Sequence, residues 1–546
     1  MASAADASRT QGMTGFLGWV ERSGNKLPDP VFLFFYLIIA LVVISMVTSA
    51  LGVSALHPTA LDESTGAALE IEAVSLLAAE NIQRLWVEMP KTFTHFHPLG
   101  YVLVVMLGAG VAERSGFFAA GMAKAVKAAP TKLLTPVVAL VAMLGNHAAD
   151  AGYVVLIPLA GILFAAAGRH PLAGIAAAFA GVSGGFSANI SPGQLDALLF
   201  GITEEAVGAS LLDPAWTANI AGNWYFISAM TVLFLPIIWY VTDKVIEPRL
   251  GPWTGGAMAG AGDADTSPDP TVHEGALASK GLRHAGLAAL GVVVLWAVMV
   301  FAPGTPLIDE GACLTEAGAV VPDCSIHAQL APFYRSLVAA FFVLFLATGW
   351  AYGRATGTIK DHRDLVNMMA ESMKDMGYYL VLAFAAAHFV AMFGWSNLGL
   401  ISAVHGAAAI QSTGLPLPLV LGLMVLFAAM LNLFVGSASA KWALLAPILV
   451  PMLMLLGISP EGATAAYRVG DSATNIITPL MVYFPLILVF AQRWQKDFGL
   501  GSLTATMLPY SLYLLVSGTV LIVIWFYLGI PLGPDAPVGY VLPGAG

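Results

Sequence analysis

Charged residues are scarce in this sequence of 546 residues. Only 10% of the side chains are charged, 58% are hydrophobic, and the mean hydropathy is +0.81. A water-soluble domain of this length would aggregate with so few charges, so the composition predicts a membrane protein. The apolar runs also lack the alternation of apolar and polar residues that a β-barrel strand of about 10 residues requires. A bundle of membrane-spanning helices is therefore expected.

The chain also lacks the motifs of several enzyme classes. It contains no Gly-Lys dipeptide, hence no Walker A phosphate loop for an ATP-driven pump, and no HExxH for a zinc protease. Residues 181–184 match the GxSG of rhomboid-type proteases, and Asp471 follows a glycine as in intramembrane aspartyl proteases. Arg468 stands where the aspartyl motif needs glycine. We therefore expect no enzyme, and an intramembrane protease is only a weak alternative.

Cysteine is nearly absent. The two cysteines, Cys313 and Cys324, both lie in the stretch 303–332, which contains no lysine or arginine. A disulfide between them would persist if this stretch faces an oxidising compartment. Two free thiols are an equal alternative, and the sequence leaves both open.

Long apolar segments, in contrast, are abundant. Runs of about 20 apolar residues, enough for a helix to cross a bilayer, recur between residues 31 and 530. The first 30 residues lack an apolar core followed by a small-residue cleavage site, so we expect no cleaved signal peptide. The expected fold class is an all-α, polytopic membrane protein whose first span directs insertion.

The basic residues predict the orientation, because Lys and Arg in short loops stay on the cytoplasmic side. They cluster within residues 114–132, 244–283 and 354–374. In contrast, residues 54–98 contain two basic and six acidic residues, and residues 303–332 contain no basic residue. We therefore expect a protein of the bacterial inner membrane with a cytoplasmic N-terminus.

A solvated linker divides the chain. The stretch 251–280 is rich in Gly, Ala, Asp and Pro and has no apolar periodicity, which is typical of a flexible connection. The expected order is a cytoplasmic N-terminal segment, a first transmembrane half, a cytoplasmic linker, a second transmembrane half and a periplasmic tail. These segments are residues 1–30, 31–249, 250–282, 283–530 and 531–546.

Each half contains a zone in which the apolar segments are too short to span and are interrupted by Gly, Pro and Asn. The first zone has GRHP at 168–171 and then Asn189, and the second has GISP at 457–460 and then Asn475. A motif placed once per half is what an inverted-repeat transporter predicts, with coincidence as the alternative. Irregular backbone is tolerated at membrane depth only against protein or a water-filled cavity. Both zones, each expected to contain a re-entrant hairpin, should therefore line a cavity.

Ionisable side chains gather in the same two zones. A charge inside the bilayer costs at least about 2.5 kcal/mol on insertion scales, so each one needs a partner or a function. They are His147, Asp150 and Asp196 in the first zone and Lys441, Arg468 and Asp471 in the second.

The second zone predicts a binding site for an anion and an ion. Arg468 would hold a carboxylate with two hydrogen bonds. Asp471, Asn475 and Asn432 would offer oxygens to Na⁺, or the aspartate would accept a proton. Arg468 and Asp471 stand three residues apart on one helical face, so a salt bridge within the helix is the structural alternative.

Aromatic residues and the first zone complete the prediction. Trp442 and Tyr467 would stack on an aromatic ring, and simple packing is an equal alternative for each. Asp196 would serve equally well as a helix cap, and His147 is more often a structural hydrogen-bonder than a proton relay. The polar side chains that mirror the second zone are Asn146, His147, Asp150, Asn189, Ser191 and Asp196.

Several long strings resemble the AbgT family of p-aminobenzoyl-glutamate transporters. They include GNKLPDP, NHAADAGYVVLIPLAG, SANISPGQLDALLFGIT, GSASAKWALLAP and RVGDSATNIITPLMVYFPLIL, and they extend over nearly the whole chain. The resemblance implies a homodimer in which each subunit has about nine spanning helices, two re-entrant helical hairpins and one solvated pathway.

The resemblance also implies roles for individual residues. Asn432 and Asn475 match the family's cation ligands, with Asp471 beside them as a possible third Na⁺ ligand. From the mirrored positions of the residues, and not from the resemblance, Asn146, Asp150 and Asn189 are the ion-coupling candidates of the first zone. His388 departs from the family, in which glutamine is expected, and would add a titratable group. The substrate-binding positions carried over are Asp196, Ser439, Trp442, Pro460, Arg468, Asp471 and Pro479.

The expected function is secondary active transport of p-aminobenzoyl-glutamate or a related aryl-amine carboxylate, a small organic anion. A Na⁺ or H⁺ gradient would drive it by alternating access, with no other cofactor and no nucleic-acid partner. The alternative is proton-driven export of sulfonamide antimetabolites, which share the aminobenzene ring and need Arg468 less. Direction, substrate and coupling ion remain open at this stage.

Overall fold

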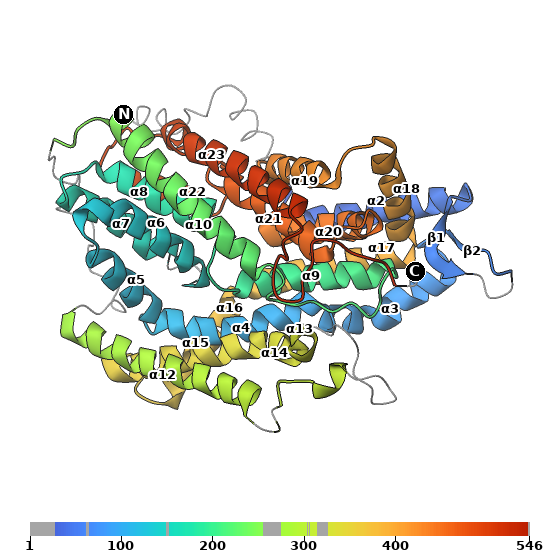
Figure 1. Ribbon diagram of the computed structural model, residues 1–546, viewed down its shortest axis with the longest axis horizontal. Helices are drawn as coiled ribbons and strands as arrows, with labels where there is room; N and C mark the ends of the chain where they lie inside the picture. Colours follow the sequence, from blue (N-terminus) through green and yellow to red (C-terminus); the bar gives the residue numbers. More distant parts are fainter. Residues whose placement is uncertain are drawn as a thin grey trace, which may run out of the picture.

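Helices make up nearly all of the computed structural model (Figure 1). The structure describes residues 28–61, 65–148, 152–254, 275–302, 304, 306–313 and 326–543. The expectations for the N-terminal segment, for most of the linker, for Asp150 and for the Cys313–Cys324 pairing fall wholly or partly outside the described residues.

Eight helices in the described part of the chain are long and apolar enough to cross a membrane, or up to ten if each of two bent helix pairs is one span. The expected number of spans lies within this range, so the polytopic helical fold is confirmed. The eight are Pro30–Ala50 (α2), Ala79–Arg114 (α3, Ala79–Thr94, and α4, His97–Arg114), Trp224–Leu250 (α10, Trp224–Tyr240, to α11, Glu247–Leu250), Gly275–Phe301 (α12), Leu337–Thr356 (α15), Gly377–Trp395 (α17), Ala438–Leu455 (α20) and Leu500–Tyr527 (α23).

The stretch 54–98, expected to be a loop, contains secondary structure in its described residues. It forms an antiparallel pair of strands, β1 (Ser54–Leu61) and β2 (Ala68–Glu72), followed by the amphipathic helix α3. Exposed residues alternate with less exposed ones throughout β2 and over residues 55–59 of β1, which is the period of a half-solvated strand. This two-stranded sheet marks one end of the bundle, the sheet end. The opposite end, where α11 stops and α12 starts, is the linker end (Figure 1).

The two halves repeat the same order of elements. A helix pair bent by 117° opens the first repeat, and a pair bent by 118° opens the second. Each pair is followed by two helices joined by a short turn, by a break, and by two further helices. The first repeat is α5 (Phe117–Lys127), α6 (Leu134–Leu144), α7 (Ile157–Ala166), α8 (Pro171–Phe179), α9 (Gln194–Ser210) and α10. The second is α18 (Leu398–Ser412), α19 (Leu417–Asn432), α20, α21 (Pro460–Asn475), α22 (Phe484–Gln492) and α23.

The matched GxxP strings form the same turn in both repeats. Gly168 has φ 71° and Gly457 has φ 86°, a left-handed conformation that glycine adopts without steric cost and that commonly ends a helix. Pro171 and Pro460 then occupy the first position of α8 and α21, where the missing N–H is harmless. The sequence motif therefore marks where one helix stops and the next one starts.

Each repeat also reverses direction at a hairpin tip deep in the bundle. The first tip (residues 145–148) lies between α6 and α7, and a Cβ on Gly152 would lie 3.7 Å from the Gly145 carbonyl oxygen, so the two sides of this turn are in contact. The second tip (residues 433–437) lies between α19 and α20. The helix that follows each hairpin is interrupted, at the first break (residues 185–193) and at the second break (residues 476–483). These are the re-entrant and discontinuous helices that the sequence predicted.

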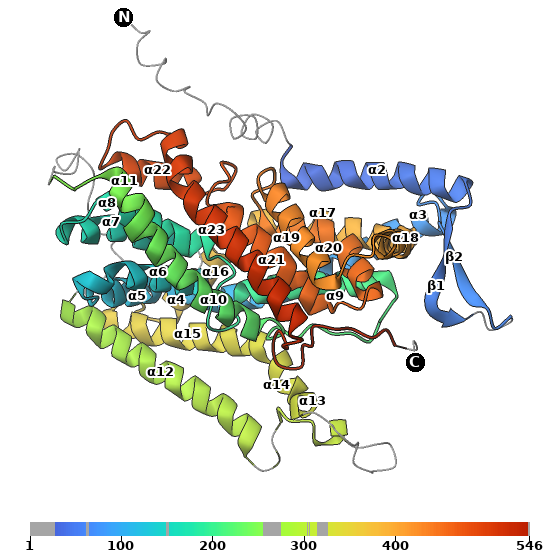
Figure 2. The same cartoon turned by 45° about the horizontal axis from the view of Figure 1, so that its top comes forward.

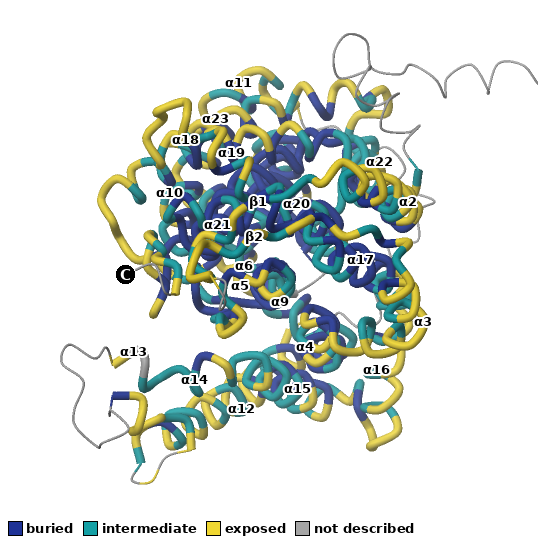
Figure 3. The backbone as a smooth tube through the Cα atoms, turned by 90° about the vertical axis from the view of Figure 1, so that its right-hand side faces the viewer, coloured by how far each residue is buried: buried dark blue, intermediate teal, exposed yellow. Residues whose placement is uncertain are grey.

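Burial separates a central unit from an outer layer. Every residue of α21 is buried, as is every residue of α8, and Figure 3 shows buried segments gathered around α20, α21, α6 and α9. The outer layer contains α12 and α15: α12 packs on α15, and α15 packs on α4 (Figure 2). Many exposed side chains of α12 are large and apolar, for example Leu287 and Val293, as expected for a helix that faces lipid.

Candidate functional site

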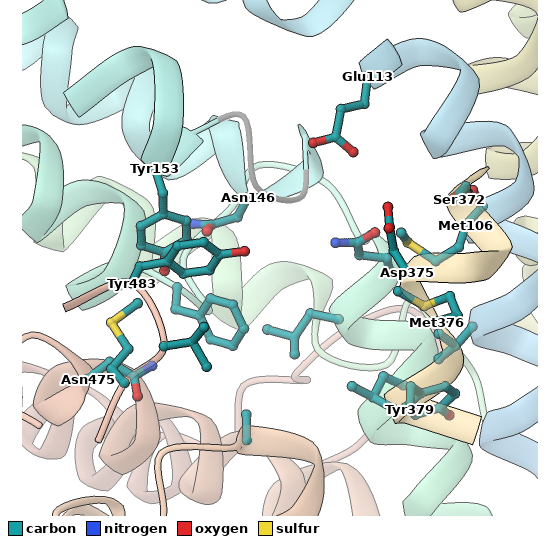
Figure 4. A pocket seen from close by; sticks show the side chains of 18 of the residues that line it. Met106, Glu113, Asn146, Tyr153, Ser372, Asp375, Met376, Tyr379, Asn475 and Tyr483 are labelled. Carbon is teal, nitrogen blue, oxygen red and sulfur yellow. Dashed lines mark hydrogen bonds between the residues drawn. The ribbon is translucent and has the colours of Figure 1, made fainter. Parts of the chain in front are cut away.

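A cavity of about 380 Å³ separates the central unit from the outer layer (Figure 4). One wall comes from α4, from α16 (His362–Asp375) and from the start of α17. The other wall comes from both hairpin tips and both breaks, through Asn146, Phe186, Gly436, Asn475 and Tyr483. The prediction that the two irregular zones line one cavity is therefore correct.

Charged residues stand at one end of the cavity. Glu113, Arg114 and Asp375 line it there, and Arg114 Nη2 lies 2.5 Å from Asp375 Oδ2. In Figure 4, Glu113 and Asp375 point inward from this end, while Asn475 lies at the opposite side. The pair links α4 to α16, and both side chains are partly exposed, so it contributes little to stability.

The cavity wall also contains aromatic and unpaired polar groups. Tyr153 and Tyr483 stack with ring centroids 4.3 Å apart and planes 10° apart, which joins the first hairpin to the second break. Gln194 Oε1 and the Tyr379 hydroxyl are buried and have no hydrogen-bond partner among the described residues. A buried polar atom without a partner costs free energy, so both atoms are candidates for contact with a bound molecule. Neither residue was predicted from the sequence, because neither departs from the surrounding composition.

The predicted ion site of the second half assembles around Asn432. Its Nδ2 donates to the Asp471 backbone carbonyl at 2.7 Å and to Asn475 Oδ1 at 2.8 Å. Asn432 is the last residue of α19, so these bonds tie the second hairpin to α21. Gly470 allows this approach, since a Cβ there would lie 2.2 Å from the Val425 carbonyl oxygen. The three predicted residues Asn432, Asp471 and Asn475 therefore do come together.

Lys441 completes this cluster, although no role was predicted for it beyond the need for a partner or a function. Its ammonium group forms an ion pair with Asp471 Oδ1 and donates to Asn432 Oδ1, and the side chains of Lys441 and Asp471 are only 2% exposed. No spacing in the sequence pointed to this contact, because Lys441 and Asp471 lie on different helices, α20 and α21.

Arg468 pairs with a residue of the other half. Its Nη1 donates to Asp196 Oδ1 at 2.6 Å, with 1% and 5% of the two side chains exposed. Asp196 Oδ2 also accepts from the Gly193 N–H at 2.8 Å, so the aspartate caps the start of α9 and binds arginine at the same time. The alternative of a salt bridge between Arg468 and Asp471 does not describe this structure, because the two residues have different partners. Arg468 Nη1 is thus occupied by Asp196, whereas Arg468 Nε is buried and has no hydrogen-bond partner among the described residues.

Trp442 and Tyr467 stack on each other. Their ring centroids are 4.6 Å apart with planes inclined by 24°. Trp442 Nε1 donates to Thr203 Oγ1 at 3.0 Å, and the Tyr467 hydroxyl donates to the Ala438 carbonyl at 2.6 Å. Both rings are fully buried, so the packing alternative describes this conformation.

The remaining substrate candidates lie apart from the cavity wall. Ser439 is in the first turn of α20, where its hydroxyl is 3.2 Å from Ser437 Oγ. Pro460 starts α21 and is buried. Pro479 is part of the second break and is partly exposed. Among the predicted site residues, Asn146 and Asn475 line the cavity directly.

The first half contains a counterpart of the Asn432 contact. Asn146 Nδ2 donates to the Gly185 carbonyl at 3.3 Å, as Asn432 does to the Asp471 carbonyl. Asn432, Asp471 and Asn475 each stand 286 positions after Asn146, Gly185 and Asn189. The repeat therefore extends to individual hydrogen bonds.

Other polar residues of the first half surround this contact. Asn189 Nδ2 lies 3.4 Å from the Met143 carbonyl, which also accepts from Asn146 Nδ2 at 3.0 Å. His147 Nε2 lies 3.1 Å from Ser191 Oγ, which joins the first tip to the first break. Asp150 lies outside the described residues. The first-half candidates are thus close together, with Asp150 left as a prediction.

His388 lies on α17 and is 4% exposed. Its Nδ1 is 2.7 Å from the Phe384 carbonyl oxygen, the residue one turn earlier, and its Nε2 has no hydrogen-bond partner in the described part of the chain. The expected effect of a titratable group in this segment stays a prediction.

Paired re-entrant hairpins and interrupted helices that meet at one cavity define a membrane transporter. The chain belongs to the AbgT family: the model of the "AbgT putative transporter family" matches residues 15–540. The p-aminobenzoyl-glutamate transport protein of Escherichia coli (strain K12) is 36% identical over 518 residues, which are 95% of this chain and 96% of that protein.

Two solved structures are similar over their full length. The YdaH transporter of Alcanivorax borkumensis has a TM-score of 0.82 and 42% identity, and the match covers 93% of this chain and 100% of that one. MtrF of Neisseria gonorrhoeae, whose structure is said to illuminate a class of antimetabolite efflux pumps, has a TM-score of 0.83 and 42% identity. This match covers 96% of this chain and 100% of the MtrF chain. The transporter role and the family expected from the sequence are therefore confirmed.

Proposed function

We propose that the protein is a secondary active transporter of p-aminobenzoyl-glutamate or a closely related aryl-amine carboxylate. The observation that carries this proposal is the cavity wall, where the unpaired Gln194 Oε1 and Tyr379 hydroxyl lie in the same cavity as the stacked Tyr153 and Tyr483. An aryl amine would donate to Gln194 Oε1, a carboxylate would accept from the Tyr379 hydroxyl, and the aryl ring would pack on tyrosine. The name of the Escherichia coli relative supports this substrate class.

Export of sulfonamide antimetabolites is the second candidate. Arg468 is already paired with Asp196, and a neutral sulfonamide needs no arginine. The aminobenzene ring and amine would use the same tyrosines and Gln194. The similarity to MtrF supports this candidate.

The setting that we propose is the bacterial inner membrane, with a cytoplasmic N-terminus and with two subunits forming a homodimer. The clusters of basic residues at the linker end support this orientation. A Na⁺ or H⁺ gradient supplies the energy, and each subunit works by alternating access.

Transport by purified protein in proteoliposomes tests the proposal. Labelled p-aminobenzoyl-glutamate and a labelled sulfonamide are each followed under Na⁺ and pH gradients imposed separately and in both directions. Accumulation of the first compound supports the importer, and expulsion of the second supports the exporter. Counterflow by unlabelled substrate distinguishes a carrier from a channel. If neither compound moves while a control anion leak is absent, the proposed substrate class is wrong.

A further inference from the structure

We infer that the Lys441 ammonium is a tethered cation that fills the second-half ion site, so that this half does not take up Na⁺. The family resemblance implies a cation at Asn432 and Asn475, with Asp471 beside them. The inference rests on the proposed ion coupling and specifies which half of the molecule leaves Na⁺ out.

One oxygen of each of the three side chains in this site already receives a hydrogen-bond donor. Asp471 Oδ1 and Asn432 Oδ1 both receive the Lys441 ammonium. Asn475 Oδ1 receives the Asn432 amide at 2.8 Å. A hard cation needs several oxygen ligands at once, so these residues do not fit Na⁺ while Lys441 is in place.

The charges of the site lead to the same conclusion. Asp471 is the carboxylate in contact with Lys441, and the next ion pair along α21, between Arg468 and Asp196, is already balanced. The adjacent helix α19 contains no charged residue. A second cation beside the buried ammonium would face its repulsion, and the described residues around it offer no further unpaired carboxylate to offset that repulsion.

The first half lacks a counterpart of the Lys441–Asp471 ion pair in its described residues. Asn146 makes the same type of contact, with the Gly185 carbonyl, as Asn432 makes with the Asp471 carbonyl. The position of Asp471 is taken by a glycine there, and α6 and α7 contain no lysine or arginine. The described residues of the two repeats therefore share a backbone geometry, but among them only the second repeat places a lysine ammonium at this contact.

Na⁺-dependent thermal unfolding of the purified protein tests the inference without any transport assay. The midpoint is measured in NaCl and in choline chloride at equal ionic strength, for wild type and for Lys441→Met. The variant is expected to gain a Na⁺-specific rise of the midpoint beyond that of wild type, because Asp471 and Asn432 are released to bind the ion. The additional rise is expected to vanish in Lys441→Met/Asp471→Asn and in Lys441→Met/Asn475→Ala.

Two outcomes would overturn the inference. One is a Lys441→Met protein that folds but shows no additional Na⁺-specific rise. The other is a wild-type rise that Asn475→Ala removes, which would show that Na⁺ binds here beside the lysine. If Lys441→Met does not fold, the comparison of wild type with Asn475→Ala decides alone. The inference then predicts that NaCl raises the unfolding midpoint of these two proteins equally. The unfolding measurement needs no transported substrate. Failure of the proposed transport function can therefore be distinguished from failure of the inference about Lys441.

Discussion

Removal of one partner of the Arg468–Asp196 pair should destabilise the protein more than removal of both. The two side chains are 1% and 5% exposed, and the pair joins α21 of the second half to α9 of the first. Breaking a buried pair leaves an uncompensated charge and costs about 3–5 kcal/mol. Asp196→Ala also removes the 2.8 Å bond to the Gly193 N–H, a capping contact of about 1 kcal/mol.

The expected shift follows from the length of the chain. With an unfolding entropy of about 2 cal/mol/K per residue, a chain of this size shifts its midpoint by about 1 °C for each kcal/mol. Asp196→Ala is therefore expected to lower the midpoint by about 3–6 °C. The double variant Asp196→Leu/Arg468→Met removes both charges and should recover most of this loss.

The assay is a thermal scan at fixed rate in detergent, with Arg114→Met as the matched control, since it breaks a partly exposed ion pair and should change the midpoint by less than about 1 °C. Transport adds a second readout. Because Arg468 is engaged by Asp196, Arg468→Met should reduce transport of a dicarboxylate and of a neutral sulfonamide equally. A selective loss of the dicarboxylate, or a double variant no more stable than Asp196→Ala, would refute this reasoning.

Three further predictions concern the cavity, the second tip and the outer layer. Gln194→Ala should raise the KM for the transported aryl amine by about 2–10-fold without lowering the melting temperature, because Gln194 Oε1 has no partner to lose; an unchanged KM would remove Gln194 from the binding site. Gly436→Ala should abolish most transport while the protein still inserts, since a Cβ would lie 2.6 Å from the Leu480 carbonyl oxygen and push the second tip from the second break; full activity in proteoliposomes would contradict this. Backbone N–H groups of Lys360 and Asp361 lower the pKa of Asp364 from its ordinary 3.8, so its contribution to the start of α16 is complete above that value and is lost as the pH falls through the lowered pKa. Hydrogen exchange in the first turn of α16 should therefore rise on acidification, after correction for intrinsic exchange. The rise should be smaller in Asp364→Asn, which keeps the Asp361 cap on the Arg363 and Asp364 N–H groups; identical profiles in both proteins would count against it.

The sequence was sufficient for the architecture because each signal was local. Apolar runs predict spans, GxxP marks the turn before α8 and before α21, and Asn189 and Asn475 mark the breaks. The contacts within the site were beyond such signals. Lys441 meets Asp471, and Arg468 meets Asp196 from 272 positions away, through the packing of separate helices. The strands β1 and β2 were also missed, since their short polar segments resemble an ordinary loop.

The contact of Asn146 with Gly185, and of Asn432 with Asp471, has an evolutionary consequence. Both asparagines bind a backbone carbonyl, and a carbonyl is supplied by every amino acid. After a duplication, the side chain at this position could differ between the copies without loss of the anchoring bond, although each copy restricts which side chain fits: a Cβ on Gly185 would lie 2.6 Å from the Gly181 carbonyl oxygen. One copy has glycine there and the other a carboxylate that pairs with lysine. Conservation of residue type would therefore hide the kinship of the two sites, whereas the retained anchor reveals it.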